Sequence, residues 1–101
     1  MHIEPASSRD EIVLPNTLGY ERVAMASSAC FAKLQGLPDE RIEDLKTIVA
    51  ETAINAMQHG NCGRPDARVV IVLDVAGNHI NVKVTDEGYG FKKEIKDPDI
   101  D

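Results

Sequence analysis

The stretch from Asp39 to His59 carries the strongest structural signal in the chain, because its apolar residues recur at three- and four-residue spacing. This pattern predicts one long helix with a buried stripe made of Ile42, Leu45, Ile48, Val49, Ala53 and Ala56. Pro38 is tolerated where a helix begins, and the acidic residues that follow it favour the helix dipole. Gly60 is a natural terminator. A helix with one apolar stripe requires a second layer to pack against.

A β-hairpin in the second half of the chain can supply that layer. Val69–Leu73 is dense in β-branched residues, which predicts a strand covered on both faces. Residues 76–78 are typical of a turn. The return strand alternates, with Ile80, Val82 and Val84 on one side and polar residues on the other.

The first third of the chain adds one strand and one helix. Residues 11–14 predict a short strand, and Asn16 or Thr17 can cap a helix that runs from about Leu18 to Leu34 and ends at Gly36. The expected order is strand, helix, helix, strand, strand. This order predicts an α+β fold, a two-layer sandwich with both helices on one face of a mostly antiparallel mixed sheet.

Size and charge exclude several classes of function. The 101 residues suffice for one domain. A net charge of −6 and only four aromatic residues argue against a nucleic-acid partner. No apolar run approaches the roughly 20 residues that span a bilayer, and no signal peptide is recognisable. Two cysteines make no disulfide framework, so we expect a cytoplasmic protein without a membrane partner.

The first candidate site lies near the end of the predicted long helix. Glu51 and Asn55 are four residues apart, with Gln58 and His59 one turn further on, so the first two side chains share one helix face. A carboxylate can act as a general base, and an amide oxygen is a hard ligand suited to magnesium. On spacing alone, a solvated polar helix edge is the more common explanation of the pair.

The second candidate site follows the return strand, at residues 86–91. Gly88 and Gly90 allow the backbone to turn sharply and to approach a ligand closely. Asp86 can accept a hydrogen bond from an exocyclic amine such as that of adenine. An ordinary glycine turn, with Asp86 bonded to local amides, is the alternative. The segment matches neither a Walker loop nor a dinucleotide-binding fingerprint.

Taken together, the two segments resemble a known pair of motifs. Glu-Thr-Ala-Ile-Asn-Ala-Met-Gln-His-Gly at 51–60 and Asp-Glu-Gly-Tyr-Gly-Phe at 86–91 are similar to the N box and the first glycine box of the GHKL (Bergerat-fold) ATPases. The ending Asn-Ala-x-x-His-Gly is most similar to the anti-sigma-factor serine/threonine protein kinases within that superfamily. The resemblance covers roughly residues 10–91.

The resemblance implies ATP and Mg²⁺ as cofactors. Glu51 would be the catalytic base, which takes the proton from the attacking hydroxyl of a protein serine or threonine. Asn55 would help to hold Mg²⁺, and Asp86 would bind adenine. The residues implied to contact the nucleotide are Asn55, His59, Asp86, Gly88 and Gly90.

The function that this resemblance implies is an ATP-dependent serine/threonine protein kinase that phosphorylates a small anti-sigma-factor antagonist or a related scaffold protein. It would regulate transcription through a sigma factor or a stress switch, and homodimers are usual in this family. A non-catalytic module of the same fold, which docks a sigma factor or antagonist, is the alternative. A histidine-phosphorylating enzyme of the same superfamily is a third possibility, although these residues include no dimerisation helix with a phosphoacceptor histidine.

The resemblance also suggests how the chain is divided. Residues 1–10 are expected to be a flexible lead-in, 11–91 the ATP-binding kinase-like domain, and 92–101 a charged tail that begins the ATP lid. Family members continue into a second glycine-rich box, so we expect this chain to be truncated at its C-terminus.

Overall fold

The computed structural model describes residues 8–77, 79–87 and 92–96, the last of these as backbone only. The elements in chain order are β1 (Arg9–Pro15), α1 (Glu21–Leu34), α2 (Asp39–Asn55), the π-helical turn η1 (Ala56–Gly60), β2 (Arg68–Ala76), β3 (His79–Asp86) and β4 (Lys92–Lys96). The expected order of strand, helix, helix, strand, strand is confirmed, and β4 extends it.

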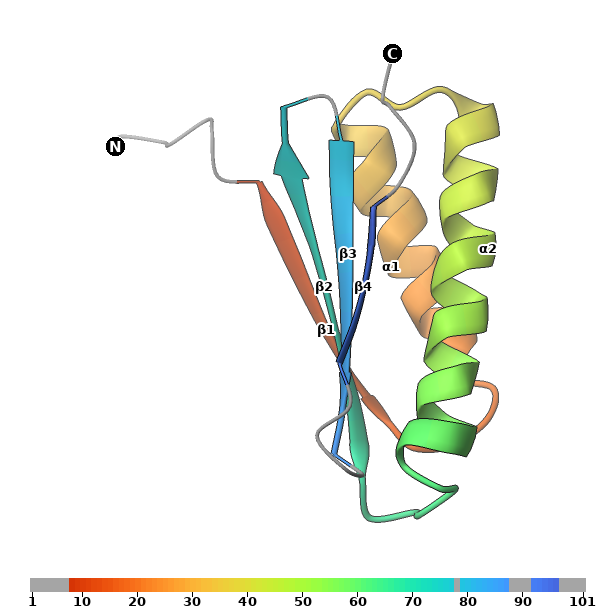
Figure 1. The fold of residues 1–101 in the computed structure, drawn as a ribbon. Helices are drawn as coiled ribbons and strands as arrows, with labels where there is room; N and C mark the ends of the chain where they lie inside the picture. The colour runs from red at the N-terminus through yellow and green to blue at the C-terminus, as the bar shows by residue number, and fades with distance from the viewer. Residues whose placement is uncertain (1–7, 78, 88–91, 97–101) are drawn as a thin grey trace, which may run out of the picture.

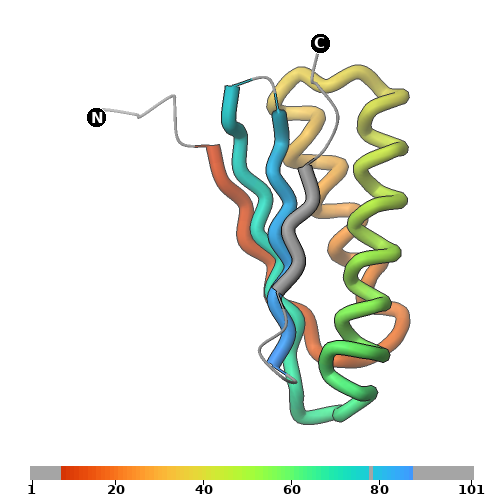
Figure 2. The backbone as a smooth tube through the Cα atoms, viewed as in Figure 1, coloured from red at the N-terminus to blue at the C-terminus, as the bar shows by residue number. Residues whose placement is uncertain are grey.

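The strands form one sheet in the order β1-β2-β3-β4, and every pairing among the described strands is antiparallel. Figure 1 shows α1 and α2 side by side on the same face of this sheet. The α+β two-layer architecture predicted from the sequence is therefore confirmed. The backbone tube in Figure 2 shows how the turn after α2 brings the chain back to the sheet.

The core lies between the two layers. The sheet contributes a continuous apolar face, since Ile12 pairs with Ile71 and Ile71 pairs with Val84 across three neighbouring strands. Leu45 and Val49 of α2 pack onto this face and are completely buried. Burial of a side chain of this size contributes roughly 1.5–3 kcal/mol to folding. The predicted apolar stripe of α2 is thus the surface that fixes this helix over the sheet.

The hairpin follows the predicted alternation. Ile80, Val82 and Val84 of β3 are buried, as expected. In β2 the alternation is clearer than the sequence indicated, because Val69, Ile71 and Leu73 are buried while the intervening residues are only half-buried. The prediction that this strand is covered on both faces was therefore wrong, since both helices pack on the same side of the sheet.

Two boundaries near the N-terminus differ from expectation. The first strand begins at Arg9, so Arg9 and Asp10, which were assigned to the lead-in, pair with β2. The first helix begins at Glu21 instead of Leu18, because Gly19 adopts a left-handed φ of 108° that interrupts the helix. Asn16 does not cap the helix, since its side chain is buried in a different network.

The C-terminal end of the described chain also differs. Residues 92–96, expected to be part of a charged tail, form β4 and pair with β3 from Thr85 to Asn81. Hydrogen bonding along β3 is sufficient to extend the sheet, whatever the polarity of the added segment. Among the described residues, no helix has the length and apolar character needed to cross a membrane.

Candidate functional site

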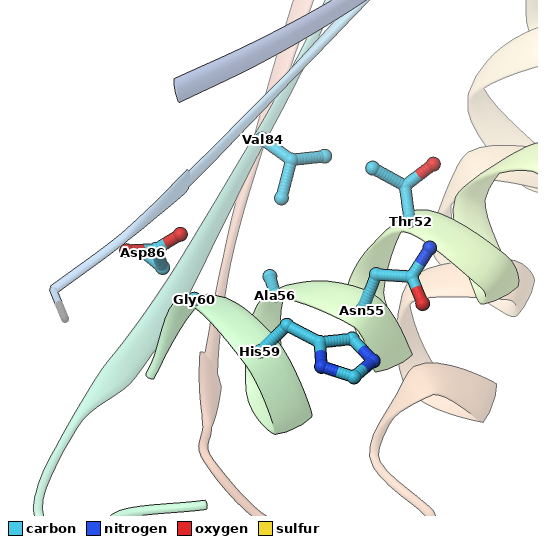
Figure 3. A pocket seen from close by; sticks show the side chains of 7 residues that line it. All are labelled: Thr52, Asn55, Ala56, His59, Gly60, Val84 and Asp86. Carbon is cyan, nitrogen blue, oxygen red and sulfur yellow. The ribbon is translucent and has the colours of Figure 1, made fainter. Parts of the chain in front are cut away.

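A cavity of about 250 Å³ lies between the end of α2 and the end of β3. Its lining residues come from both candidate segments and are Thr52, Asn55, Ala56, His59, Gly60, Val84 and Asp86. Figure 3 shows Asp86 on the β3 side of this cavity and the side chains of Asn55 and His59 projecting from the helical side. Segments about thirty residues apart in sequence thus form one site.

The walls of the cavity are mostly apolar. Val84 and Ala56 supply only hydrocarbon. Thr52 donates its hydroxyl to the carbonyl oxygen of Ile48 at 2.6 Å, and its methyl group points toward Val84 in Figure 3. The cavity is slightly smaller than the range of about 300–1,000 Å³ typical of drug-sized ligands, so its volume suits a ring system the size of a nucleobase.

Asp86 provides the carboxylate at one side of the cavity. The residue is only 5% exposed, because it is the last residue of β3 and continues the inward-facing series of Ile80, Val82 and Val84. Its side chain lies against the backbone of Gly60. A buried acid beside apolar walls is suited to accept hydrogen bonds from a ligand amine.

The backbone of η1 arranges the helical side of the cavity. At residue 56 the α-helical pattern of α2 gives way to a π-helical turn, in which the Asn61 N–H donates to the Ala56 carbonyl at 2.7 Å. Turns of this kind are frequent at functional sites. The wider turn carries His59 and Gly60 to the cavity together with Ala56. The sequence predicted a helix to about His59, and did not distinguish this last turn from the rest.

Glu51 does not line the cavity. It is exposed on α2, one helical turn before Asn55. The structure therefore brings Asn55, His59 and Asp86 to one cavity and leaves Glu51 at the exposed surface beyond the set of lining residues. Gly88 and Gly90, the other two predicted nucleotide contacts, lie outside the described residues.

Two arginines hold the residue that follows Asp86. Arg68 donates two hydrogen bonds to the Glu87 carboxylate, both at 3.2 Å, and Arg64 donates to the Glu87 carbonyl oxygen at 2.8 Å. The hydrogen bond from Arg68 lowers the pKa of Glu87, and the charges of Arg68 and Arg64 act in the same direction. Glu87 in turn raises the pKa of Arg68. This ion pair tethers Glu87, the residue that follows β3, to the start of β2.

A buried pair of asparagines, Asn16 and Asn61, lies next to the Glu87 backbone. Asn61 is completely buried and accepts a hydrogen bond from the Glu87 N–H at 2.7 Å. Its amide nitrogen donates to Asn16 Oδ1 at 3.1 Å and to the Arg68 carbonyl at 3.0 Å. Asn16 also donates to the carbonyl oxygens of Met57 and Arg64. The pair therefore connects four segments of backbone around the end of α2 and the start of β2.

The sequence motifs did not predict a functional role for several residues of this site. Val84 was assigned to the core, Gly60 to helix termination and Asn16 to helix capping. The inward position of Asp86 was detectable, since it continues the period-two alternation of β3. The four-residue spacing of Thr52 and Ala56 in the sequence also indicates that they share one helix face. Asn61 had no such signal, because its partners are distant in sequence.

In the part of the chain that the structure describes, no three His, Cys, Asp or Glu residues lie close enough together to hold a metal ion. Within the site itself, the Asn55 amide and the His59 ring are the groups with ligand chemistry on the helical side.

Comparison with known proteins shows which family the chain resembles over most of its length. Residues 14–101 match the model of the histidine kinase-like ATPase domain. The chain is 29% identical over 97 residues to "Serine-protein kinase RsbW" of Listeria innocua, an alignment that covers 94% of this chain and 62% of the relative. It is 30% identical over 84 residues to the protein of the same name from Oceanobacillus iheyensis, covering 83% and 53% of the two chains.

The chain is also similar to a relative that carries a different name. "Anti-sigma F factor" of Clostridium botulinum is 33% identical over 73 residues, an alignment that covers 72% of this chain and 49% of the relative. The chain thus spans between about half and three fifths of the length of these relatives. The family match covers most of the chain and includes both motifs. This protein therefore belongs to the histidine kinase-like ATPase domain family, as the resemblance to GHKL ATPases predicted.

Proposed function

We propose that this protein is an ATP- and Mg²⁺-dependent serine/threonine protein kinase of the anti-sigma-factor type. The observation that carries the proposal is the position of Asp86, buried across an apolar cavity from Asn55 and His59. The names of the relatives, serine-protein kinase and anti-sigma F factor, support the same activity.

The chemistry of the cavity fits an adenine ring. Val84, Ala56 and the methyl group of Thr52 offer flat apolar contact to its faces. The Asp86 carboxylate accepts a hydrogen bond from the exocyclic amine, which guanine lacks at the equivalent position. Because the cavity holds about 250 Å³, the base occupies it and the phosphates extend beyond it. Gly88 and Gly90 are proposed to contact the nucleotide as well.

The helical side of the cavity suits the phosphates and their metal. Asn55 is exposed, and its amide oxygen is a hard ligand of the kind that Mg²⁺ accepts alongside phosphate oxygens and water. His59 lies on the same side and is proposed to contact the nucleotide. When bound, Mg²⁺ supplies neutralisation of the phosphate charge. The acidic chain, with a net charge of −6, otherwise offers little of that neutralisation.

Glu51 is proposed as the catalytic base. Its exposed position, one turn before Asn55, allows a protein substrate to bring a serine hydroxyl between the carboxylate and the γ-phosphate. The carboxylate takes the hydroxyl proton as the serine oxygen bonds to the γ-phosphorus, and the bond from that phosphorus to the bridging oxygen of ADP breaks.

Nucleotide titration tests the proposal. We expect the chain to bind the non-hydrolysable ATP analogue AMP-PNP in isothermal titration calorimetry. The variant Asp86→Asn, which keeps the size of the side chain, is expected to bind about tenfold to a hundredfold more weakly, because a hydrogen bond to a charged group contributes roughly 1.5–3 kcal/mol. Binding that is absent in the wild type, or unaffected in Asp86→Asn, would overturn the proposal.

The protein substrate is proposed to be a small anti-sigma-factor antagonist or a related scaffold, with a sigma factor as a second partner. Large apolar side chains that are exposed on β1 and around α1 support protein contacts, including a homodimer; they are Val13, Leu18, Tyr20, Val23 and Leu34. Light scattering coupled to size-exclusion chromatography tests the dimer. We also propose a cytoplasmic location, where ATP and sigma factors are available.

The second candidate is a binding module of the same fold that does not turn over ATP. The exposed position of Glu51, away from the cavity, is the observation that favours it. Capture of a sigma factor or antagonist that is unchanged by Glu51→Gln and Asn55→Ala, without phosphorylation of the captured protein, would favour this module over the kinase.

A further inference from the structure

We propose that Asn61 is a positioning residue for the nucleotide site, because its buried side chain fixes the peptide unit that joins Asp86 to Glu87. This inference rests on the proposed function for its consequence in ATP binding. Its structural part, the control of Asp86 by Asn61, can be tested without any nucleotide.

The argument begins with the hydrogen bonds of Asn61. The Oδ1 atom accepts the Glu87 N–H at 2.7 Å, and the Nδ2 atom donates to Asn16 Oδ1 and to the Arg68 carbonyl oxygen. Both hydrogens of the amide and one lone pair of its oxygen are therefore used within the protein. Since Asn61 is completely buried, loss of these bonds would leave backbone and side-chain groups unsatisfied.

The bond to Glu87 acts directly on Asp86. The N–H of Glu87 belongs to the planar peptide unit whose other end is the Cα atom of Asp86. A fixed direction for this N–H therefore fixes the ψ angle of Asp86. On the other side, Asn61 is the direct neighbour of Gly60, against which the Asp86 carboxylate packs. The hydrogen bond from Glu87 to Asn61 thus ties together the two residues next to them in sequence, Asp86 and Gly60, which are in contact.

The surroundings of Asn61 make this bond rigid. Asn16 holds the Asn61 amide in place, because it binds the carbonyl oxygens on either side of it in sequence, those of Met57 and Arg64. Arg64 also donates to the carbonyl oxygen of Glu87, so both polar groups of the Glu87 backbone are held. The backbone that carries the Asp86 side chain is therefore held before a ligand arrives, and the carboxylate packs against Gly60, which reduces the ordering cost of binding.

The hydrogen bonds at position 61 also explain why the residue there is an asparagine. Aspartate at position 61 would accept the Glu87 N–H but could not donate to Asn16 or Arg68, and it would bury a charge. Alanine would remove all three bonds. An amide of this length is the group that accepts from one backbone segment and donates to another from the same buried position.

The experiment compares Asn61→Ala with the control variant Asn16→Ala. The control removes Asn61's partner at Nδ2 and two backbone contacts, but it keeps the bond from Asn61 to Glu87. Three quantities are measured for each: the thermal unfolding midpoint, the hydrogen-exchange rate of the Glu87 amide by NMR, and the affinity for AMP-PNP with Mg²⁺. The ¹³C shift of the Asp86 carboxyl group reports on its surroundings without nucleotide.

Both variants are expected to unfold at lower temperature than the wild type. Only Asn61→Ala is expected to expose the Glu87 amide to fast exchange, to move the Asp86 carboxyl shift, and to weaken AMP-PNP binding by about tenfold or more. In Asn16→Ala the Asn61 amide still donates to the Arg68 carbonyl oxygen and still accepts the Glu87 N–H, so AMP-PNP affinity is expected to stay within about threefold of the wild type at a temperature where the variant is folded.

Two outcomes would overturn the inference. One is a Glu87 amide and an Asp86 carboxyl shift in Asn61→Ala that match those of Asn16→Ala. The other is equal loss of AMP-PNP affinity in the two variants, which would indicate a merely structural role. If the wild type does not bind AMP-PNP, the proposed function fails, while the exchange rate and the carboxyl shift still decide whether Asn61 positions Asp86. If Asn61→Ala does not fold, the variant Asn61→Leu, which removes the same three hydrogen bonds but fills the space of the side chain, is measured in the same way, with an unchanged Asp86 shift counting against the inference.

Discussion

The carboxylate of Asp86 occupies the space where a side chain on residue 60 would begin. A Cβ atom built on Gly60 would lie 2.5 Å from Asp86 Cγ and even closer to Oδ2. Gly60 does not adopt a positive φ, so its backbone conformation is open to other residues. Glycine is therefore needed at position 60 for the space it leaves to Asp86, and not for its conformational freedom.

The variant Gly60→Ala tests this relationship. We expect the added methyl group to lower stability, because overpacking of this kind costs roughly 1–3 kcal/mol. We also expect it to displace Asp86 and so to weaken AMP-PNP binding by about tenfold or more, because the carboxylate loses its proposed hydrogen bond to the base. Calorimetric titration measures the affinity, and thermal unfolding measures the stability. In the double variant Gly60→Ala/Asp86→Ala the clash with Cγ and Oδ2 is removed, so much of the stability lost in Gly60→Ala should return. Additive losses of stability would contradict the proposed contact.

The variant Glu51→Gln separates binding from chemistry. Glutamine keeps the shape of the side chain but removes the base, and Glu51 lies outside the cavity. We expect AMP-PNP affinity within about twofold of the wild type and a loss of phosphotransfer of about a hundredfold or more, in the range typical of general-base catalysis. Transfer of labelled γ-phosphate to the antagonist protein measures the rate. Transfer at an undiminished rate would exclude Glu51 as the base.

The variant Asn55→Ala tests the proposed magnesium ligand. We expect Mg²⁺ to strengthen AMP-PNP binding to the wild type, and this enhancement to fall by about tenfold in the variant, since one oxygen ligand is lost. Affinity without Mg²⁺ should change little. Gln58→Ala, an exposed position near the same end of the helix, is the control and should keep the full enhancement. Equal dependence on Mg²⁺ in all three proteins would argue against the ligand role of Asn55.

The ion pair between Glu87 and Arg68 predicts a specific dependence of stability on pH. Because the pKa of Glu87 is lowered in the folded chain, its contribution is fully present above the ordinary glutamate pKa and is lost as the pH falls through the lowered value. Both partners are exposed, so the change is small. Thermal unfolding measured as a function of pH should show a weaker loss of stability below about pH 4.5 in Glu87→Gln than in the wild type. An identical fall in the unfolding temperature of the two proteins at acid pH would contradict the prediction.

The fold was largely predictable from local patterns. The apolar stripe that contains Leu45 and Val49 and the alternation through Val82 and Val84 each report which face of an element is buried. Because burial of that face is the main source of stability, the two patterns together require two layers. The strand β4 was not predictable in this way, since it joins the sheet through backbone pairing with β3.

The candidate site was only partly determined by the sequence. Residue order by itself established the two motifs, with Asn55 and His59 on one helix and Asp86 at the end of one strand, because spacing along a helix or strand is local. Only the tertiary structure decided that these residues share a cavity without Glu51, that Gly60 gives its space to Asp86, and that Asn61 binds Glu87. Those relationships join segments 26 residues or more apart along the chain, and they exist only after the packing of α2 on the sheet has fixed the distance between them.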